Sequence, residues 1–246
     1  ERLTEQQRAI YDAGREKNPR GKACSDFNPD EGLRYQRCVP VGEFEGRVLI
    51  TGDSHAAALV KAMDRELNPQ RIAVTQFTNS GCQPIGGVSR DGSPDDCSRF
   101  NDAILDYVAG IGEEKVVVLA GRWPLAYEGR RFDNGEGGLE KGSYSASYPL
   151  GGSRNMDDIE RRTALAEKIH THVDSLLGAG KHVVLVYPIP EAGWHVPNMM
   201  LKHGADDFAP DFASTDSQRF VARAGGVMTV LDNIGEHPRL HRVRPH

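Results

Sequence analysis

The sequence of 246 residues has no apolar run long enough to cross a membrane. Its longest apolar stretches, residues 116–120 and 183–187, have the length of a strand, whereas a membrane-spanning helix needs roughly 20 apolar residues. The 246 residues do not show the charged-then-apolar pattern of a secretory signal segment. Long basic runs are also absent, which together with a net charge of −5 argues against a nucleic-acid partner. The chain starts at Glu1 and not at a methionine, so we expect a piece of a longer protein.

Closely spaced cysteine pairs of the kind that bind zinc are missing as well. The four cysteines fall into two local pairs, Cys24 with Cys38 and Cys82 with Cys97. A disulfide that closes such a short loop can stabilise a fold by about 3 kcal/mol. We therefore predict two disulfides and an oxidising compartment, and the alternative is four reduced cysteines in the core. Because no histidine pair combines helical spacing with acidic neighbours, we predict no metal site.

Apolar segments of strand length alternate with helical patterns along most of the chain. We predict strands at residues 47–51, 72–77, 115–120, 182–187 and 227–231. We predict helices at residues 3–13, 55–67, 99–111, 157–177 and 215–224. Strands that alternate with helices form a parallel sheet covered on both faces. The predicted fold class is therefore α/β, a three-layer α/β/α sandwich with about five parallel strands.

The length and the composition, 38% apolar and 26% charged, favour one large globular domain. Residues 1–46 show little regular pattern, so we predict an N-terminal extension over 1–46, held by the first disulfide, and the α/β domain over 47–246. A segment rich in Gly, Ser and Tyr, residues 121–156, reads as a long loop. Loops of this length often line functional sites, so this one is our candidate for a substrate lid or acceptor groove.

A serine stands where the first predicted strand gives way to a helix, in the segment Gly52-Asp53-Ser54-His55. Open α/β sheets hold reactive groups at the carboxyl ends of their strands, and the amides of a helix N-terminus stabilise negative charge. Ser54 is therefore a candidate nucleophile whose own N–H can serve as an oxyanion donor. The alternative is that Ser54 only caps the helix. Asp53 in turn can fix the turn by accepting backbone hydrogen bonds.

Five short motifs, in order along the chain, resemble one protein family. "GDSHAAAL", "NSGCQP", "DDCSRFN", "VVVLAGRW" and "YPIPEAGWHVP" are similar to the SGNH (GDSL-like) hydrolase superfamily. The branch they resemble is the periplasmic SGNH domain fused behind an acyltransferase-3 membrane domain. The resemblance covers about residues 20–246. It implies the same α/β/α sandwich and O-acetylation of bacterial surface polysaccharides, such as the O-antigen of lipopolysaccharide.

The resemblance also implies roles for single residues. Ser54 takes the position of the nucleophile, and Gly81 that of an oxyanion donor through its amide. Arg122 stands where the superfamily has an asparagine donor, so its guanidinium either replaces that donor or pairs with an acid. The supporting residues that we name are Asp53, His55, Trp123 and His195. We expect Trp123 to pack in the core, and the alternative is that it stacks on a sugar. His195 lies in a predicted loop from which it could reach substrate.

The last block of the family, Asp-x-x-His, supplies the base and the acid that orients it, and this sequence does not contain it. The nearest spacing is that of Asp232 and His237. We expect the missing block to lie beyond His246, in which case this piece is inactive alone.

These observations lead to one favoured function and two alternatives. The favoured function is the periplasmic domain of a carbohydrate O-acetyltransferase of the inner membrane, in which Ser54 passes an acetyl group to a glycan hydroxyl. The acetyl group would arrive through an N-terminal acyltransferase-3 membrane domain, with no cofactor bound to this chain. The alternatives are a carbohydrate acetylesterase, in which water resolves the acyl-enzyme, and a non-catalytic module that orients a glycan.

Overall fold

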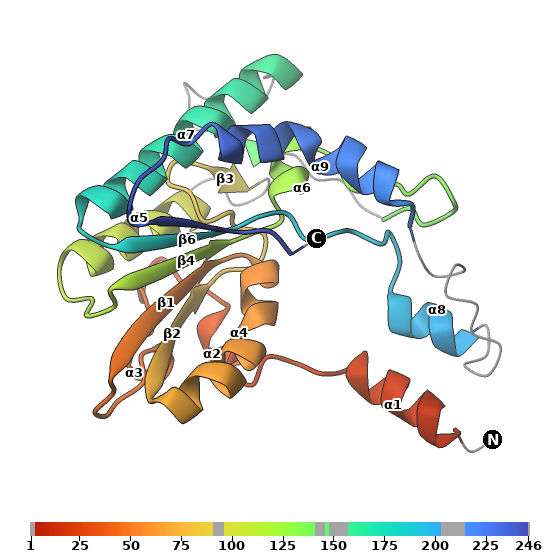
Figure 1. Cartoon of the computed structure of the whole chain (residues 1–246), viewed down its shortest axis with the longest axis horizontal. Helices are drawn as coiled ribbons and strands as arrows, with labels where there is room; N and C mark the ends of the chain where they lie inside the picture. Colours follow the sequence, from red (N-terminus) through yellow and green to blue (C-terminus); the bar gives the residue numbers. More distant parts are fainter. Residues whose placement is uncertain (1–2, 91–95, 141–145, 148–156, 203–214, 246) are drawn as a thin grey trace.

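A computed structural model of the chain describes residues 3–90, 96–140, 146–147, 157–202 and 215–245. Within them, five strands form one sheet in the order β2-β1-β4-β6-β7, and every pairing is parallel (Figure 1). The strands are β1 (Gly46–Gly52), β2 (Ile72–Thr78), β4 (Val116–Ala120), β6 (His182–Val186) and β7 (Leu240–Val243). The predicted α/β class with a parallel sheet of five strands is confirmed.

Helices cover both faces of the sheet and complete the three layers. On one face, α4 (Ser54–Leu67) packs Ala56 and Val60 against apolar residues of the strands such as Ile50. The other face is covered by α5 (Asp96–Ala109), α7 (Asp158–Gly178) and α9 (Ser217–Asp232). Because both faces are buried, the strands are almost continuously apolar, as in the Val-Val-Val-Leu-Ala sequence of β4.

The order of the strands changes direction between β1 and β4. The chain passes from β1 outward to β2 and then returns past β1 to β4. Such a switch point leaves a crevice at the carboxyl ends of the two strands, where ligands of open α/β sheets bind. Ser54 follows β1 and Arg122 follows β4, so the fold places both residues at this switch point.

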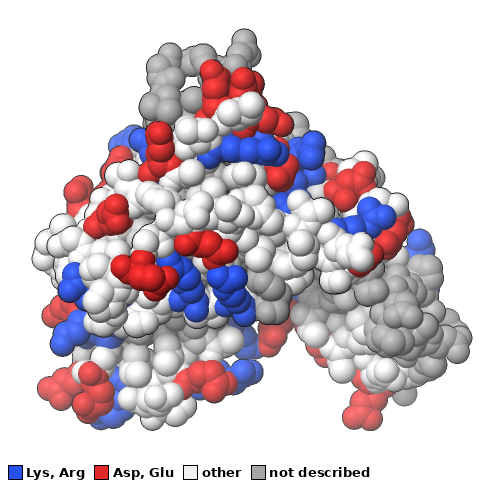
Figure 2. All heavy atoms as spheres, turned by 45° about the horizontal axis from the view of Figure 1, so that its top comes forward, with Lys and Arg blue, Asp and Glu red and all other residues white. Residues whose placement is uncertain are grey.

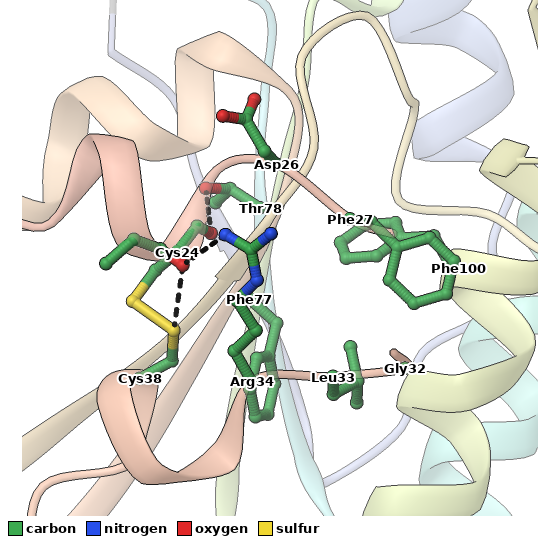
Figure 3. Close-up of a pocket in the computed structure, with 11 residues that line it drawn as sticks. Cys24, Asp26, Phe27, Gly32, Leu33, Arg34, Cys38, Phe77, Thr78 and Phe100 are labelled. Atoms are coloured by element: carbon green, nitrogen blue, oxygen red, sulfur yellow. Dashed lines mark hydrogen bonds between the residues drawn. A yellow bond between two sulfur atoms is a disulfide. The ribbon is translucent and has the colours of Figure 1, made fainter. Parts of the chain in front are cut away.

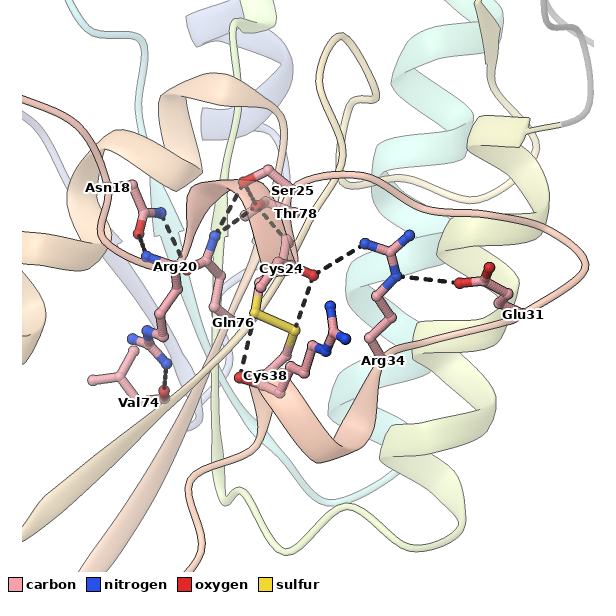
Figure 4. The surroundings of a disulfide bond; sticks show 12 residues. Asn18, Arg20, Cys24, Ser25, Glu31, Arg34, Cys38, Val74, Gln76 and Thr78 are labelled. Carbon is pink, nitrogen blue, oxygen red and sulfur yellow. Dashed lines mark hydrogen bonds and ion pairs between the residues drawn. A yellow bond between two sulfur atoms is a disulfide. The ribbon is translucent and has the colours of Figure 1, made fainter.

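Both predicted disulfides, Cys24–Cys38 and Cys82–Cys97, are present. The first joins the short helices α2 (Gly21–Cys24) and α3 (Tyr35–Cys38) beside the outer edge of β2 (Figure 4). There the hydroxyl of Thr78 donates to the carbonyl of Cys24 over 3.0 Å. Next to this disulfide, Phe27 and Phe100 help to enclose a cavity of about 10 Å³, which is no larger than one water molecule (Figure 3). The extension therefore covers the sheet edge and offers no ligand site at this cavity.

The N-terminal segment is anchored at two places. Helix α1 (Glu5–Ala13) packs against α8 (Val196–Lys202), and the pair lies outside the sandwich (Figure 1). Farther along, the side-chain amide of Asn18 donates to the carbonyl of Ala57 over 2.9 Å and to Oε1 of Gln76 over 3.1 Å. Arg20 donates to the backbone carbonyl of Val74 over 2.6 Å. The segment thus contacts both α4 and the edge strand β2.

The strand predicted at 227–231 is wrong, because these residues form the second half of α9. Phe220, Ala224, Val227 and Leu231 are buried at helical spacing, and this apolar stripe extends the helix through residues of high strand propensity. The fifth strand is β7, whose four residues Leu-His-Arg-Val are half polar and gave no apolar run. The helix predicted at 215–224 is correspondingly longer, at Ser217–Asp232.

Several short elements were not predicted. Helix α6 (Trp123–Glu128) lies within the segment expected to be a loop, and α2, α3 and α8 are also short, at four, four and seven residues. A 3-10 turn, Asn68–Gln70, precedes β2, and β3 (Ser89–Arg90) pairs with β5 (Ala146–Ser147) in a small antiparallel ribbon. Residues 141–145 and 148–156 of the predicted lid or acceptor groove lie outside the described residues.

The surface carries charges of both signs. On the face seen in Figure 2, acidic and basic side chains are interspersed, and no extended patch of one sign is visible. In the part of the chain that the structure describes, no helix combines the length and the apolar character that a membrane crossing requires.

Candidate active site

Ser54 is exposed in the first turn of α4, directly after the carboxyl end of β1. The cap of this helix is Asp53, whose Oδ1 accepts a hydrogen bond from the N–H of His55 over 2.8 Å. The alternative in which Ser54 serves as the cap is therefore wrong. Within the described residues, the Ser54 hydroxyl makes no hydrogen bond, so it is open to solvent at the sheet edge.

The strand end before Ser54 requires a glycine. Gly52 has φ of 142°, and a Cβ there would lie 1.8 Å from the carbonyl oxygen of Ala120 on β4. The ends of β1 and β4 therefore approach each other more closely than any side chain at position 52 permits. This close approach brings the turn that carries Ser54 to the switch point.

The carboxylate of Asp53 joins three segments of the chain. Besides capping α4, its Oδ2 accepts hydrogen bonds from the N–H of Arg122 over 2.8 Å and from Nε2 of Gln83 over 3.1 Å. Asp53 is only 2% exposed, and burial raises its pKa above the ordinary value, against the opposing effects of His55 and of the backbone donors. These contacts are those of a residue that fixes the turn.

Gly81 lies at the same edge as Ser54. β1 and β2 are paired as far as Gly52 and Thr78, and the N–H of Asn79 donates to the carbonyl of Gly52 over 2.9 Å. Within the described residues, the N–H groups of Ser54 and Gly81 have no acceptor. Two main-chain donors are thus free at the edge where Ser54 is exposed, as an oxyanion hole requires.

The guanidinium of Arg122 is held by two carboxylates. Nη1 donates to Oε1 of Glu140 over 2.8 Å, and Nε donates to Oε1 of Glu191 over 2.5 Å. Burial disfavours the charged form, but the hydrogen bonds and charges of Glu140 and Glu191 outweigh it and raise the pKa of Arg122. The hydrogen bond from Arg122 also lowers the pKa of Glu140. Of the two roles expected for Arg122, these contacts support pairing with an acid, and the donor role stays a prediction.

Arg122 is the centre of a chain of five alternating charges. Glu140 also binds Arg131 over 3.2 Å, and Glu191 also binds Arg223 over 3.2 Å. The side chains of Glu191 and Arg223 are only 6% and 7% exposed, so their charges are largely removed from water. The chain connects the loops after β4, α6 and β6 with helix α9. It therefore fixes the loops on this side of the switch point.

Sequence reasoning missed most of these partners. Gln83 and Glu191 lie in the quoted motifs "NSGCQP" and "YPIPEAGWHVP", which was a signal that we did not use. Asn134 has no such signal, although it is fully buried and donates to the carbonyl of Ala192 over 3.1 Å. This bond ties the loop after α6 to the loop after β6.

The remaining predicted site residues are Trp123, His195 and His55, and each has contacts away from the Ser54 hydroxyl. Trp123 is fully buried and donates from Nε1 to the carbonyl of Val186 over 2.8 Å, which is the packing role expected. His195 is exposed next to α8, where its Nδ1 accepts from the N–H of Asn198 over 3.3 Å. His55 contributes its N–H to the cap of α4. None of the three is hydrogen-bonded to Ser54.

No histidine of the described residues is hydrogen-bonded to the Ser54 hydroxyl. Asp232 accepts instead from the hydroxyl of Tyr187 over 2.7 Å, and His237 accepts from the N–H of Arg239 over 3.1 Å. Asp232 and His237 therefore have other partners and do not form the missing pair. Among the described residues, no group of three or more His, Cys, Asp or Glu side chains is placed to hold a metal ion, and the absence of a metal site stays a prediction.

The fold resembles that of one solved structure in particular. The periplasmic domain of a lipopolysaccharide acetyltransferase from Salmonella ser. Paratyphi A is 14% identical with a TM-score of 0.58, over 98% of this chain and 80% of that one. TesA (12% identity, TM-score 0.35, 77% of this chain and 99% of that one) scores lower. An acetyl xylan esterase from the rumen bacterium Butyrivibrio proteoclasticus also scores lower, with 11% identity and a TM-score of 0.37 over 83% of this chain and 56% of that one. The first likeness is one of fold.

A parallel α/β/α sandwich with an exposed serine directly after its first strand places the protein in the class of SGNH-type domains. The sequence profile of one family, the SGNH domain fused to AT3 domains, matches residues 22–246. The chain belongs to this family, as the five motifs indicated. No curated protein matches the chain. The predicted boundary between an extension and a domain at residue 46 stays a prediction, and the family profile begins within that extension.

Proposed function

We propose that this chain is the extracytoplasmic part of a carbohydrate O-acetyltransferase and that Ser54 carries the acetyl group. The observation that carries the proposal is the exposed Ser54 hydroxyl with the free N–H groups of Ser54 and Gly81 at the same sheet edge. A hydroxyl that must be acylated needs an open approach and donors for the oxyanion, and this edge offers both. The fusion with AT3 domains in this family supports a membrane partner that delivers the acetyl group.

The reaction has two steps that mirror each other. Oγ of Ser54 loses its proton to a base and attacks the acetyl carbonyl, and the oxyanion that forms lies against the two N–H groups. The bond to the donor breaks, the donor takes the proton, and an ester with Ser54 remains. A glycan hydroxyl then gives its proton to the base and attacks this ester. The bond from the acetyl carbon to Oγ breaks, and Ser54 regains a proton.

We infer that the base comes from an Asp-x-x-His segment outside the 246 residues. β7 is parallel to β1, so its carboxyl end lies at the edge where Ser54 is exposed, and a segment that continues from β7 would reach this edge. Without this segment we expect Ser54 to remain unacylated. Adding the downstream segment to the chain and measuring acylation of Ser54 by mass spectrometry tests the inference.

The periplasm is the compartment that we propose. Two disulfides with no free cysteine among the described residues suit an oxidising environment. The acceptor would be a polysaccharide of the bacterial surface, for which the acetyltransferase of similar fold from Salmonella is a precedent.

Replacing Ser54 with alanine in the intact protein tests the proposal. Asp53 caps α4 and the Ser54 side chain has no partner, so Ser54→Ala leaves the melting temperature unchanged while acetylation of the glycan is lost. Acetylation at the wild-type level would exclude covalent chemistry at Ser54 and leave a module that only orients the glycan.

The second candidate is a carbohydrate acetylesterase, because the same serine and donors serve when water replaces the sugar hydroxyl. Acetate release and acetyl transfer, measured on the intact protein with the same donor, separate the two. Transfer that exceeds release supports the acetyltransferase, and release without transfer supports the esterase.

A further inference from the structure

The two disulfides of this chain form a matched pair with different surroundings. They join cysteines 14 and 15 positions apart, and all four cysteines are buried. Loops of nearly equal length lose similar entropy in the unfolded chain, so we expect both bonds to contribute similarly to stability. Cys24–Cys38 lies at the outer edge of β2 (Figure 4). Cys82–Cys97 begins one residue after the free N–H of Gly81.

The position of the Gly81 amide depends on a short turn that ends at Cys82. The N–H of Asn79 is bonded to Gly52 at the end of β1, and the N–H of Cys82 donates back to the carbonyl of Asn79 over 3.0 Å. Gly81 lies between these two bonds with φ of 76°, a left-handed conformation that glycine adopts readily. The first residue of the turn is therefore bonded to β1, and the position of its last residue depends on the contacts of Cys82.

Helix α5 holds Cys82. Cys97 lies in the first turn of α5, and the side chain of Asn101, one turn further on, lies 2.9 Å from the carbonyl oxygens of both Gln83 and Cys97. Asn101 and Gln83 are 0% and 1% exposed, so these contacts are shielded from water. The covalent bond and Asn101 thus attach the Gly81 turn to the same end of α5.

Gln83 connects this attachment to Ser54. Its Nε2 donates to Oδ2 of Asp53 over 3.1 Å and to the carbonyl of Arg122 over 3.2 Å. Asp53 directly precedes Ser54 and caps the helix that Ser54 begins. A continuous path of bonds therefore runs from α5 through the Gly81 turn to the Ser54 turn, and it sets the separation of the two free N–H groups.

We propose that Cys82–Cys97 positions the oxyanion donor Gly81, whereas Cys24–Cys38 only stabilises the fold. The proposal rests on the proposed function of Ser54. Without Cys82–Cys97, the Gly81 turn keeps its bond to β1 and the contact of Gln83 with Asn101 but loses its covalent tie to α5. We expect the Gly81 N–H then to hold a less fixed position at the sheet edge. Oxyanion donors act through such fixed placement, so the loss falls on the transition state more than on substrate binding.

Two double variants of the intact protein test the proposal, Cys82→Ala/Cys97→Ala and the matched control Cys24→Ala/Cys38→Ala. We expect each to lower the melting temperature by a similar amount, roughly 10 °C. Well below both melting temperatures, the first lowers kcat about tenfold to hundredfold with KM nearly unchanged. The control keeps kcat within about twofold of wild type. Equal losses of kcat in the two variants, or no loss in the first, would overturn the proposal.

Backbone order at Gly81 gives a readout that does not depend on activity. In the 246-residue chain, the NMR order parameter of the Gly81 amide falls from about 0.85 to below about 0.6 in Cys82→Ala/Cys97→Ala and stays high in the control. An unchanged order parameter would overturn the positioning role. If the alanine pair does not fold, Cys82→Val/Cys97→Val refills the space of the sulfurs and gives the same readouts. Full turnover in Ser54→Ala would instead refute the proposed function. The order parameter of the Gly81 amide would then be the measurement that tests whether the disulfide holds this turn.

Discussion

The backbone N–H of Arg122 donates a hydrogen bond to the buried carboxylate of Asp53 over 2.8 Å. Through this one bond, the loop after β4 is attached to the residue that precedes Ser54. The same carboxylate also accepts from Gln83 and His55, so three turns at the sheet edge share one acceptor. The arrangement of this edge therefore depends on a carboxyl group that is almost completely buried.

Asp53→Asn is expected to lower the free energy of unfolding by about 1–3 kcal/mol, because an amide nitrogen in place of Oδ2 cannot accept from Arg122 and Gln83. Urea unfolding with an unchanged m-value measures the loss. Asp157→Asn is the control, since Asp157 caps α7 on the surface and asparagine caps as well as aspartate. Equal losses in the two variants would contradict the role of Asp53 as a shared acceptor.

His172 makes the stability of the fold depend on pH. It is 2% exposed, its Nδ1 accepts from the N–H of Gly86, and burial lowers its pKa from 6.5 to about 4. Between these two pKa values the unfolded chain binds a proton at His172 and the folded chain does not. The unfolded state is therefore stabilised relative to the folded state as the pH falls. This contribution to stability is complete above pH 6.5 and is lost towards pH 4, by about 3 kcal/mol.

Unfolding of His172→Gln in urea between pH 7 and pH 4 tests this dependence. Glutamine can still accept from Gly86 but does not titrate, so the slope of stability against pH is smaller than in the wild type. His170→Gln, on the same helix but half-buried, is the control for replacing a histidine by glutamine. A His172→Gln protein with the wild-type slope would assign the pH dependence to other groups.

Gly52→Ala is expected to prevent folding or to lower the melting temperature by more than about 10 °C, because its Cβ would lie 1.8 Å from the carbonyl oxygen of Ala120. Gly180→Ala is the matched control, since Gly180 also has a positive φ, of 79°, but no atom within 4 Å of an added Cβ. Gly180→Ala therefore introduces backbone strain without a steric clash, and we expect it to lower the free energy of unfolding by about 1 kcal/mol. Thermal melts that fall equally in both variants would show that the close approach of β1 and β4 is not limiting.

Arg122→Met separates the two roles expected for Arg122. It leaves Glu191 and Glu140 with one cation fewer, and we expect a loss of about 3 kcal/mol in the free energy of unfolding. We expect kcat of the intact protein to fall less than about tenfold, because the contacts of the guanidinium are with carboxylates. A fall of about a hundredfold or more would favour the role of oxyanion donor. Arg65→Met removes an exposed pair with Glu66 and serves as the control for stability.

Local patterns in the sequence predicted the parts of the fold that have local causes. The four longer strands are buried on both faces and read as apolar runs, and Ser54 stands at a seam where strand pattern changes to helix pattern. Strand β7 was not predicted, because only two of its four residues are apolar. Val227 and Leu231 suggested a strand but lie in helix α9. In that region, tertiary packing overrides the strand propensity of single residues.

The partners of the candidate site could not be predicted, because they are distant in the sequence. Glu140 and Glu191 pair with Arg122 across 18 and 69 residues, and neither distance has a periodic signal. The motif around Ser54 indicated the position of the nucleophile, whereas its supporting bonds through Gln83 and Asp53 depend on how three turns meet. A family resemblance supplied the role of Gly81, for which the sequence alone gives no chemical reason.

The anchoring of Asn18 and Arg20 has a consequence for any shortened form of this protein. The family profile begins at residue 22, but Asn18 satisfies the fully buried amide oxygen of Gln76, and Arg20 satisfies a carbonyl on the outer strand. A version trimmed to the profile would expose that strand and leave Gln76 without its donor. We therefore expect the smallest unit that folds well to begin before residue 22, where the family profile begins.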